Sequence, residues 1–85
     1  MPPIDFASFV FSLSTSTMMF LGLLPDPQTK EQHVDLAMAK HHIDILGLLK
    51  DKTKGNLNDE EAKFIDQSLY DLRLLFVQAC NAKTN

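Results

Sequence analysis

The feature that most constrains this chain is a run without any charged residue, from Phe6 to Leu24. A run of this length could cross a bilayer as a helix. Hydroxyl side chains pass through its middle, however, and its flanks are Asp5 and Asp26 rather than the basic residues that orient a membrane span. The first residues also lack the basic side chains of a signal peptide. We therefore expect a helix that is buried against protein.

The rest of the composition limits the class of protein. The chain has 85 residues, of which 45% are hydrophobic, so one domain with a thin core is expected. Its net charge is −3, and its basic residues begin only at Lys30, where they are mixed with acids. Because nucleic-acid binding needs a clustered basic face, we expect no nucleic-acid partner.

The first predicted helix spans residues 6–24. Asp5 is a suitable N-cap, and the Pro25-Asp26-Pro27 segment is expected to end the helix because proline cannot continue its hydrogen bonds. Phe11 and Met18 lie away from the expected core face. That core face contains Phe6, Phe9, Val10, Leu13, Thr17, Phe20 and Leu24.

Two more helices are predicted, over residues 36–54 and 59–80, with a loop before the first of them. Asp35 is the expected N-cap of the second helix, and Gly55 is expected to follow its last turn in the left-handed conformation. Asn58 and Glu61 have the spacing of a capping box at the start of the third helix. The short connection predicts an antiparallel hairpin, with Ile43 facing Leu72. The predicted fold is thus all-α, with three main helices in a single domain over residues 1–85.

The sequence offers few candidates for chemistry. His41 and His42 are neighbours and point about 100° apart on a helix, so they cannot chelate one ion together. The acidic cluster at residues 59–61 is explained by the helix dipole. Cys80 has no cationic neighbour in sequence that would activate its thiol. We expect no catalytic residue, no metal, no cofactor and no enzymatic activity.

Arg73 is a different kind of candidate. It lies two residues from Asp71, so the two side chains do not face each other on a helix. The planar guanidinium of arginine can bind a carboxylate through two hydrogen bonds. We therefore expect Arg73 to pair with a carboxylate of another helix, either within the chain or across an interface.

Several segments together resemble a small bacterial family known only as a domain of unknown function. The resemblance extends from about Phe6 to Val77. It is most specific in Lys52-Thr53-Lys54-Gly55-Asn56-Leu57 and Tyr70-Asp71-Leu72-Arg73, and it also includes Phe6-x-x-Phe9-Val10-x-Ser12-Leu13, Leu21-Gly22, Pro25-Asp26-Pro27, Asp35-Leu36, Ile43-Asp44-x-Leu46-x-x-Leu49 and Glu60-Glu61. The resemblance implies a bacterial, cytoplasmic, helical protein without an established activity.

The apolar surface predicts association with protein. The first helix is apolar on more than one side, and its serines recur at four-residue spacing, which permits close helix packing. The third helix carries a second apolar stripe at i, i+4 and i+7. We expect a structural or interaction module that forms a homo-oligomer, with a further protein partner left open; the alternative is a peripheral membrane protein that lays residues 6–24 on lipid. The predicted interface residues are Phe6, Ser8, Phe11, Ser12, Ser16, Met18, Tyr70, Leu74 and Val77.

Overall fold

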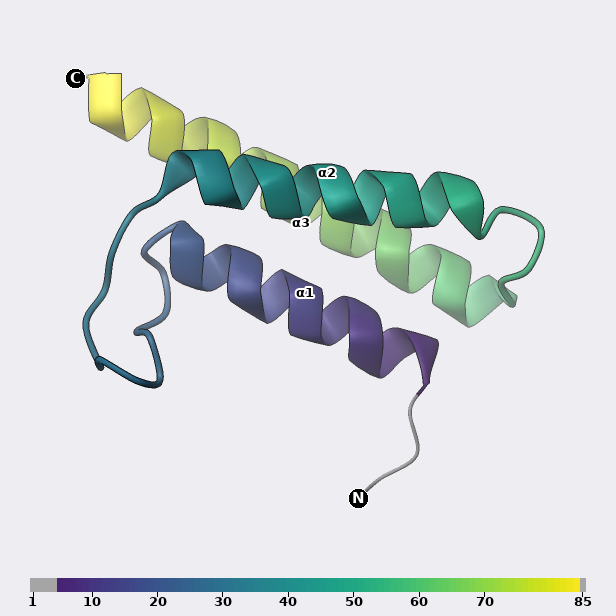
Figure 1. Ribbon diagram of the computed structural model, residues 1–85. Coiled ribbons are helices and arrows are strands. Elements are labelled where there is room, and N and C mark those ends of the chain that lie inside the picture. The colour runs from purple at the N-terminus through teal and green to yellow at the C-terminus, as the bar shows by residue number, and fades with distance from the viewer. Residues whose placement is uncertain (1–4, 85) are drawn as a thin grey trace.

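The computed structural model describes residues 5–84 and consists of three helices. They are α1 (Phe6–Phe20), α2 (Leu36–Lys52) and α3 (Asp59–Thr84), and the residues described contain no strand. Each helix packs against the other two. Figure 1 shows α2 running antiparallel to both α1 and α3. The predicted all-α fold and the antiparallel α2–α3 hairpin are confirmed.

Helix α1 begins as predicted and ends earlier. The Asp5 carboxylate accepts a hydrogen bond of 2.7 Å from the Ser8 backbone N–H. At the other end Gly22 has φ +79°, and the N–H groups of Gly22 and Leu23 donate to the carbonyls of Met19 and Met18, both at 3.0 Å. This pair of bonds is a Schellman motif. The prediction that α1 reaches residue 24 and is ended by proline is therefore wrong. The last residue of the helix is Phe20, and the turn that ends it is formed at Gly22.

The two ends of the connection between α1 and α2 are hydrogen-bonded to each other. Leu21 and Val34 form an isolated antiparallel bridge, and the Asp35 N–H donates to the Phe20 carbonyl at 2.7 Å. Within the connection, the Asp26 carboxylate accepts a bond of 2.7 Å from the Gln28 N–H. The connection therefore returns the chain to the end of α1, where Asp35 caps α2 by accepting from the Met38 N–H at 3.1 Å.

In the α2–α3 connection the positive φ of Gly55 is confirmed, but the helix end and the position of Gly55 relative to it differ from the prediction. Helix α2 ends at Lys52 rather than at residue 54, and the Thr53 hydroxyl donates to the Leu49 carbonyl at 2.7 Å. Gly55 has φ +88°, as predicted, but it lies in a turn that the Asn56 N–H closes on the Thr53 carbonyl at 2.8 Å. Gly55 therefore shapes the turn after the helix instead of occupying the position next to its cap.

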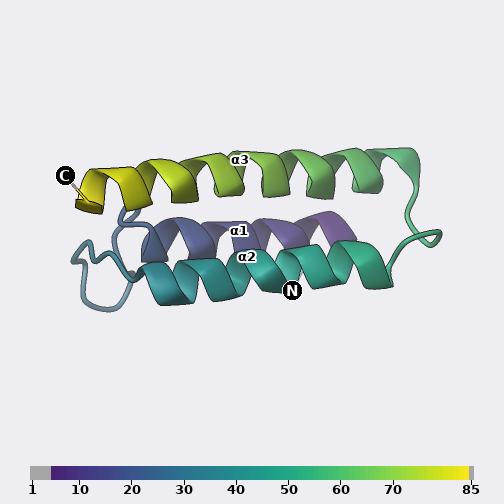
Figure 2. The ribbon, with the colours of Figure 1, turned by 90° about the horizontal axis from the view of Figure 1, so that it is seen from above.

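Helix α3 is longer than predicted and is tied to α2. Asn58 and Glu61 cap each other's backbone N–H groups at 2.8 and 3.0 Å, which confirms the capping box. The helix continues past Cys80 to Thr84. Lys50 Nζ lies 2.8 Å from Asp66 Oδ1 and joins the two helices of the hairpin. Figure 2 shows α2 and α3 extending side by side along most of their length.

The core lies between the three helices. Thr17 is fully buried with it, and its hydroxyl donates to the Leu13 carbonyl at 2.7 Å, so this hydroxyl is paired. Ile43 and Leu72, the pair expected to face each other, both belong to this core. Its apolar members are Val10, Leu21, Ala39, Ile43, Leu46, Ile65, Leu69 and Leu72.

Two assignments on α1 are wrong. Phe9 was expected in the core and is 47% exposed, whereas Met18 was expected away from the core and packs against it. Val10 and Thr17 define the buried direction of the helix. Phe9 lies about 100° from Val10 on the helical wheel, which turns it away from the buried direction. Met18 lies on the opposite side of the helix from Phe9, where it lines a depression together with residues of α3.

Candidate interaction surface

The residues considered for metal or catalytic chemistry do not converge. His42 lies with its ring centroid 5.0 Å from that of Phe20, and its Nδ1 is 3.0 Å from the Met38 carbonyl, whereas His41 is exposed. Glu61 is occupied in the capping box. Within residues 5–84, no group of three or more histidine, cysteine or acidic side chains is arranged to hold a metal ion.

The clearest electrostatic effect is at the start of α1. Hydrogen bonds from the Ser8 backbone N–H, and secondarily from its side chain, lower the pKa of the exposed Asp5 carboxyl below its ordinary value. These bonds favour the ionised carboxylate, which also complements the positive end of the helix dipole. The effect therefore belongs to helix capping.

The outer face of α1 is exposed and carries no charge. Phe11 is 64% exposed, and Ser8 and Ser12 on the same side of the helix are also exposed. The Ser12 hydroxyl donates to the Ser8 carbonyl at 3.0 Å. Because this donor is already bonded within the helix, the face can be covered by protein without leaving the hydroxyl hydrogen unpaired. We call the exposed side of α1 around Ser8, Phe11 and Ser12 the α1 face.

Other predicted interface residues on α1 are less accessible. Phe6 and Met18 are half-buried and pack against the core of their own chain. Ser16 is also half-buried. Phe11 is therefore the large apolar side chain that the α1 face presents most fully.

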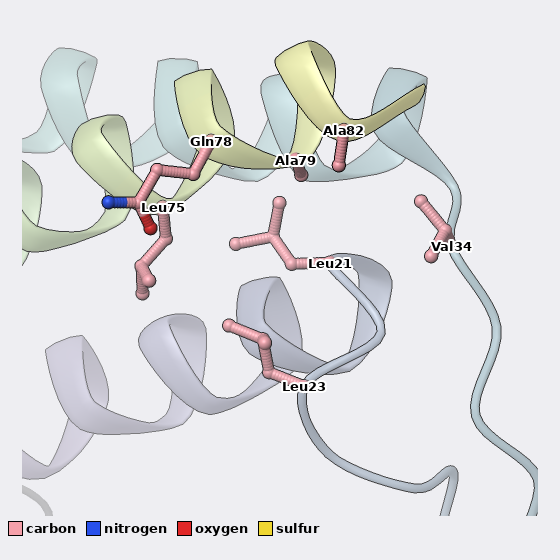
Figure 3. A pocket seen from close by; sticks show the side chains of 7 residues that line it. All are labelled: Leu21, Leu23, Val34, Leu75, Gln78, Ala79 and Ala82. Atoms are coloured by element: carbon pink, nitrogen blue, oxygen red, sulfur yellow. The ribbon is translucent and has the colours of Figure 1, made fainter. Parts of the chain in front are cut away.

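A groove that the sequence did not indicate lies between the end of α1 and the C-terminal half of α3. It has a volume of about 600 Å³. Leu23 and Val34, which are 46% and 56% exposed, reach it because the α1–α2 connection folds back at the bridge. The hydrophobic residue after Gly22 was the available signal, since a Schellman motif commonly places an apolar side chain there. Figure 3 shows the lining side chains: Leu21, Leu23, Val34, Leu75, Gln78, Ala79 and Ala82.

The second apolar stripe is on α3, as predicted. Tyr70, Leu74 and Val77 are 66%, 49% and 53% exposed. They line a depression of about 560 Å³ whose other residues are Leu69 and three charged side chains, Lys50, Asp66 and Arg73. We call this surface the α3 face. It contains both apolar area and charges of each sign.

Of the two pairings left open for Arg73, the one within the chain is absent from residues 5–84. No ion pair joins Arg73 to another described residue. Its guanidinium lies instead beside Gly47 of α2, where an added methyl group would be 3.4 Å from Arg73 Nη2. The absence of a side chain at Gly47 therefore leaves room for Arg73 to lie across the hairpin.

These observations define a small three-helix domain with two exposed apolar faces. No helix in the described part of the chain has the length and hydropathy needed to cross a membrane. The chain belongs to the family described as Domain of unknown function (DUF1844), whose pattern matches residues 3–78. No curated protein and no solved structure matches the chain. The resemblance to a family of unknown function is thus confirmed.

Proposed function

We propose that this protein is an interaction module that works in the cytoplasm as a homo-oligomer, with the α1 face buried between copies. The observation that carries the proposal is the 64% exposure of Phe11 on a helix without a charged residue. A monomer leaves this side chain in water, which forgoes about 1.5–3 kcal/mol of burial for a large apolar residue. Covering it with a second copy recovers that free energy.

The small residues on the same face support a close helix contact. Ser8 and Ser12 are one helical turn apart and both exposed, and Ser16 continues the line. Short side chains let two helix backbones approach closely. A twofold axis would bring the same face of each copy together, which is the commonest arrangement in homo-oligomers.

Phe11→Asp tests this assignment because it places a charge in the centre of the α1 face. We expect the variant to have a lower mass than the wild type by size exclusion with light scattering, or to be insoluble. Leu48→Asp is the matched control, since Leu48 is 58% exposed on α2, outside the α1 face. The proposal is wrong if Phe11→Asp is soluble and keeps the wild-type mass.

A second candidate function is peripheral membrane association. It is favoured by Phe9 and Phe11, two exposed aromatic side chains on the same uncharged helix. Interfacial helices usually carry lysine or arginine on the polar face, and α1 has neither. Co-sedimentation with anionic and with zwitterionic vesicles, together with fractionation of the native host's lysate, decides between the two. Recovery with the vesicles and the membrane fraction favours this second function; recovery in the supernatants favours the first.

A further inference from the structure

We propose that the α3 face pairs with the same face of a second copy, with the two α3 helices antiparallel around a twofold axis beside Tyr70. The inference deepens the proposed function, because it rests on the protein being a homo-oligomer and adds a contact at a different surface. It is independent of the α1 face, since the residues that line the α3 face come from α2 and α3.

The apolar part of the face is a continuous stripe. Tyr70, Leu74 and Val77 follow one another at helical spacing, and each is about half exposed or more. Leu69, which is buried, lies beneath them in the same depression. An exposed stripe of this kind, bordered by charged residues, is the pattern of a helix-packing surface.

Two charged residues, Asp66 and Arg73, lie on one flank of the stripe. Asp66 and Arg73 are seven residues apart, which places them about 20° apart around the helix and about 10 Å apart along it. Both line the α3 face. Asp66 is 2.8 Å from Lys50, whereas Arg73 has no ion pair among the residues described. The flank therefore presents a guanidinium that lacks a carboxylate partner.

An antiparallel pair supplies that carboxylate. A twofold axis perpendicular to both helices places the Asp66–Arg73 flank of one copy beside the same flank of the other. The two helices then run in opposite directions. The midpoint between Asp66 and Arg73 falls between Leu69 and Tyr70. An axis at this point sets each Arg73 opposite Asp66 of the other copy, and it brings the two Tyr70 side chains together at the centre. Arginine and carboxylate can then form reciprocal charge-assisted hydrogen bonds.

The occupant that fits this pattern is a second copy of the chain. The apolar stripe and both members of the charge pair lie on one helix, so the surface is complementary to itself under a twofold rotation. A parallel twofold pair would instead place the Asp66–Arg73 flanks of the two copies on opposite sides of the contact, so that neither Arg73 would meet Asp66 of the other copy. Charge complementarity thus selects the antiparallel orientation.

A charge exchange between two variants tests the pairing. Arg73→Glu opposes Asp66 with a carboxylate, and Asp66→Lys opposes Arg73 with an ammonium group, so we expect each variant alone to have about half the wild-type mass by light scattering. In a 1:1 mixture, a pair made of one chain of each variant has opposite charges at both contacts between positions 66 and 73. We expect the mixture to regain the wild-type mass, with native mass spectrometry showing assemblies that contain both chains.

A control in α2 separates pairing from a general effect of charge. Lys40→Glu reverses a charge outside the α3 face, where Lys40 pairs with Asp44, and it should keep the wild-type mass. The inference is overturned if Arg73→Glu or Asp66→Lys alone keeps the wild-type mass, or if mixing restores nothing.

The outcome at this face is distinguishable from the outcome at the α1 face. A loss of mass in Arg73→Glu that mixing restores, with no effect of Phe11→Asp, supports the α3 pairing and contradicts the α1 contact. The reverse result supports the α1 contact alone. A monomeric wild type overturns both.

Discussion

The three glycines differ in what an added side chain would meet and in the backbone conformation that it would have to adopt. Gly22 and Gly55 have positive φ, which side-chain-bearing residues rarely adopt, whereas Gly47 lies within α2. At Gly22 an added Cβ would also meet Val34 Cγ2 at 2.7 Å, and at Gly55 it would meet nothing within 4 Å. The three positions therefore separate conformational strain from crowding.

We predict that the three alanine substitutions differ in size and sign. Gly55→Ala should cost about 1 kcal/mol from backbone conformation alone. Gly22→Ala should cost more, because it adds the clash with Val34. Gly47→Ala should be neutral or stabilising by up to about 1 kcal/mol, since alanine favours the helix and Arg73 can move aside. Urea denaturation at one fixed protein concentration measures all three. An unchanged midpoint for Gly55→Ala would contradict the positive φ at this position.

The cap at Asp5 gives a pH-dependent prediction. Its pKa is lowered in the folded chain below the ordinary 3.8. The ionised carboxylate therefore adds stability above the unfolded pKa, and this contribution is lost as the pH falls through the folded value. We expect the wild type to melt above Asp5→Ala at neutral pH, with the difference shrinking below about pH 3.8. A difference that stays constant down to strongly acidic pH would contradict the role of the ionised cap.

At the scale of the elements, helix starts could be predicted from sequence better than helix ends. Asp5, Asp35 and Asn58 act within the next few residues, so their identity and spacing suffice. The end of α1 depends on Gly22 rather than on the more obvious prolines, and α2 stops before its glycine. Helix α3 continues past Cys80, and the chain carries no glycine or proline after that position to mark an end.

The orientation of each helix could be predicted only in part. The buried stripe of α3 repeats at helical spacing, and Leu72, expected to face Ile43, is in the core with it. Helix α1 is apolar on more than one side, and periodicity alone did not distinguish Phe9 from Met18. The choice between them is made by where α2 and α3 lie, which is a property of the whole fold.

Leu72→Ala tests the packing of the hairpin. Leu72 is 3% exposed within the core, so we expect a loss of about 2–5 kcal/mol in the free energy of unfolding. Leu48→Ala is the control, because Leu48 is 58% exposed and should lose far less. A loss below about 1 kcal/mol at Leu72 would mean that this face of α3 is not packed against the core as described.

At the scale of the molecule, the candidate surfaces combine local and long-range features. The α3 stripe and Phe11 could be predicted as exposed apolar residues from sequence. The groove beside Leu23 and Val34 depends on the folded connection, and the grouping of Lys50 with Arg73 depends on the register of α2 against α3. Such features join residues far apart in sequence, so helical periodicity contains no signal for them.

The central claim is that copies of this chain bury their apolar faces against one another. It is tested most directly by the mass of the wild-type protein in size exclusion with light scattering, at micromolar concentration and without detergent. We predict a mass of at least twice the 9.6 kDa of one chain. A mass near 9.6 kDa under these conditions would contradict the claim.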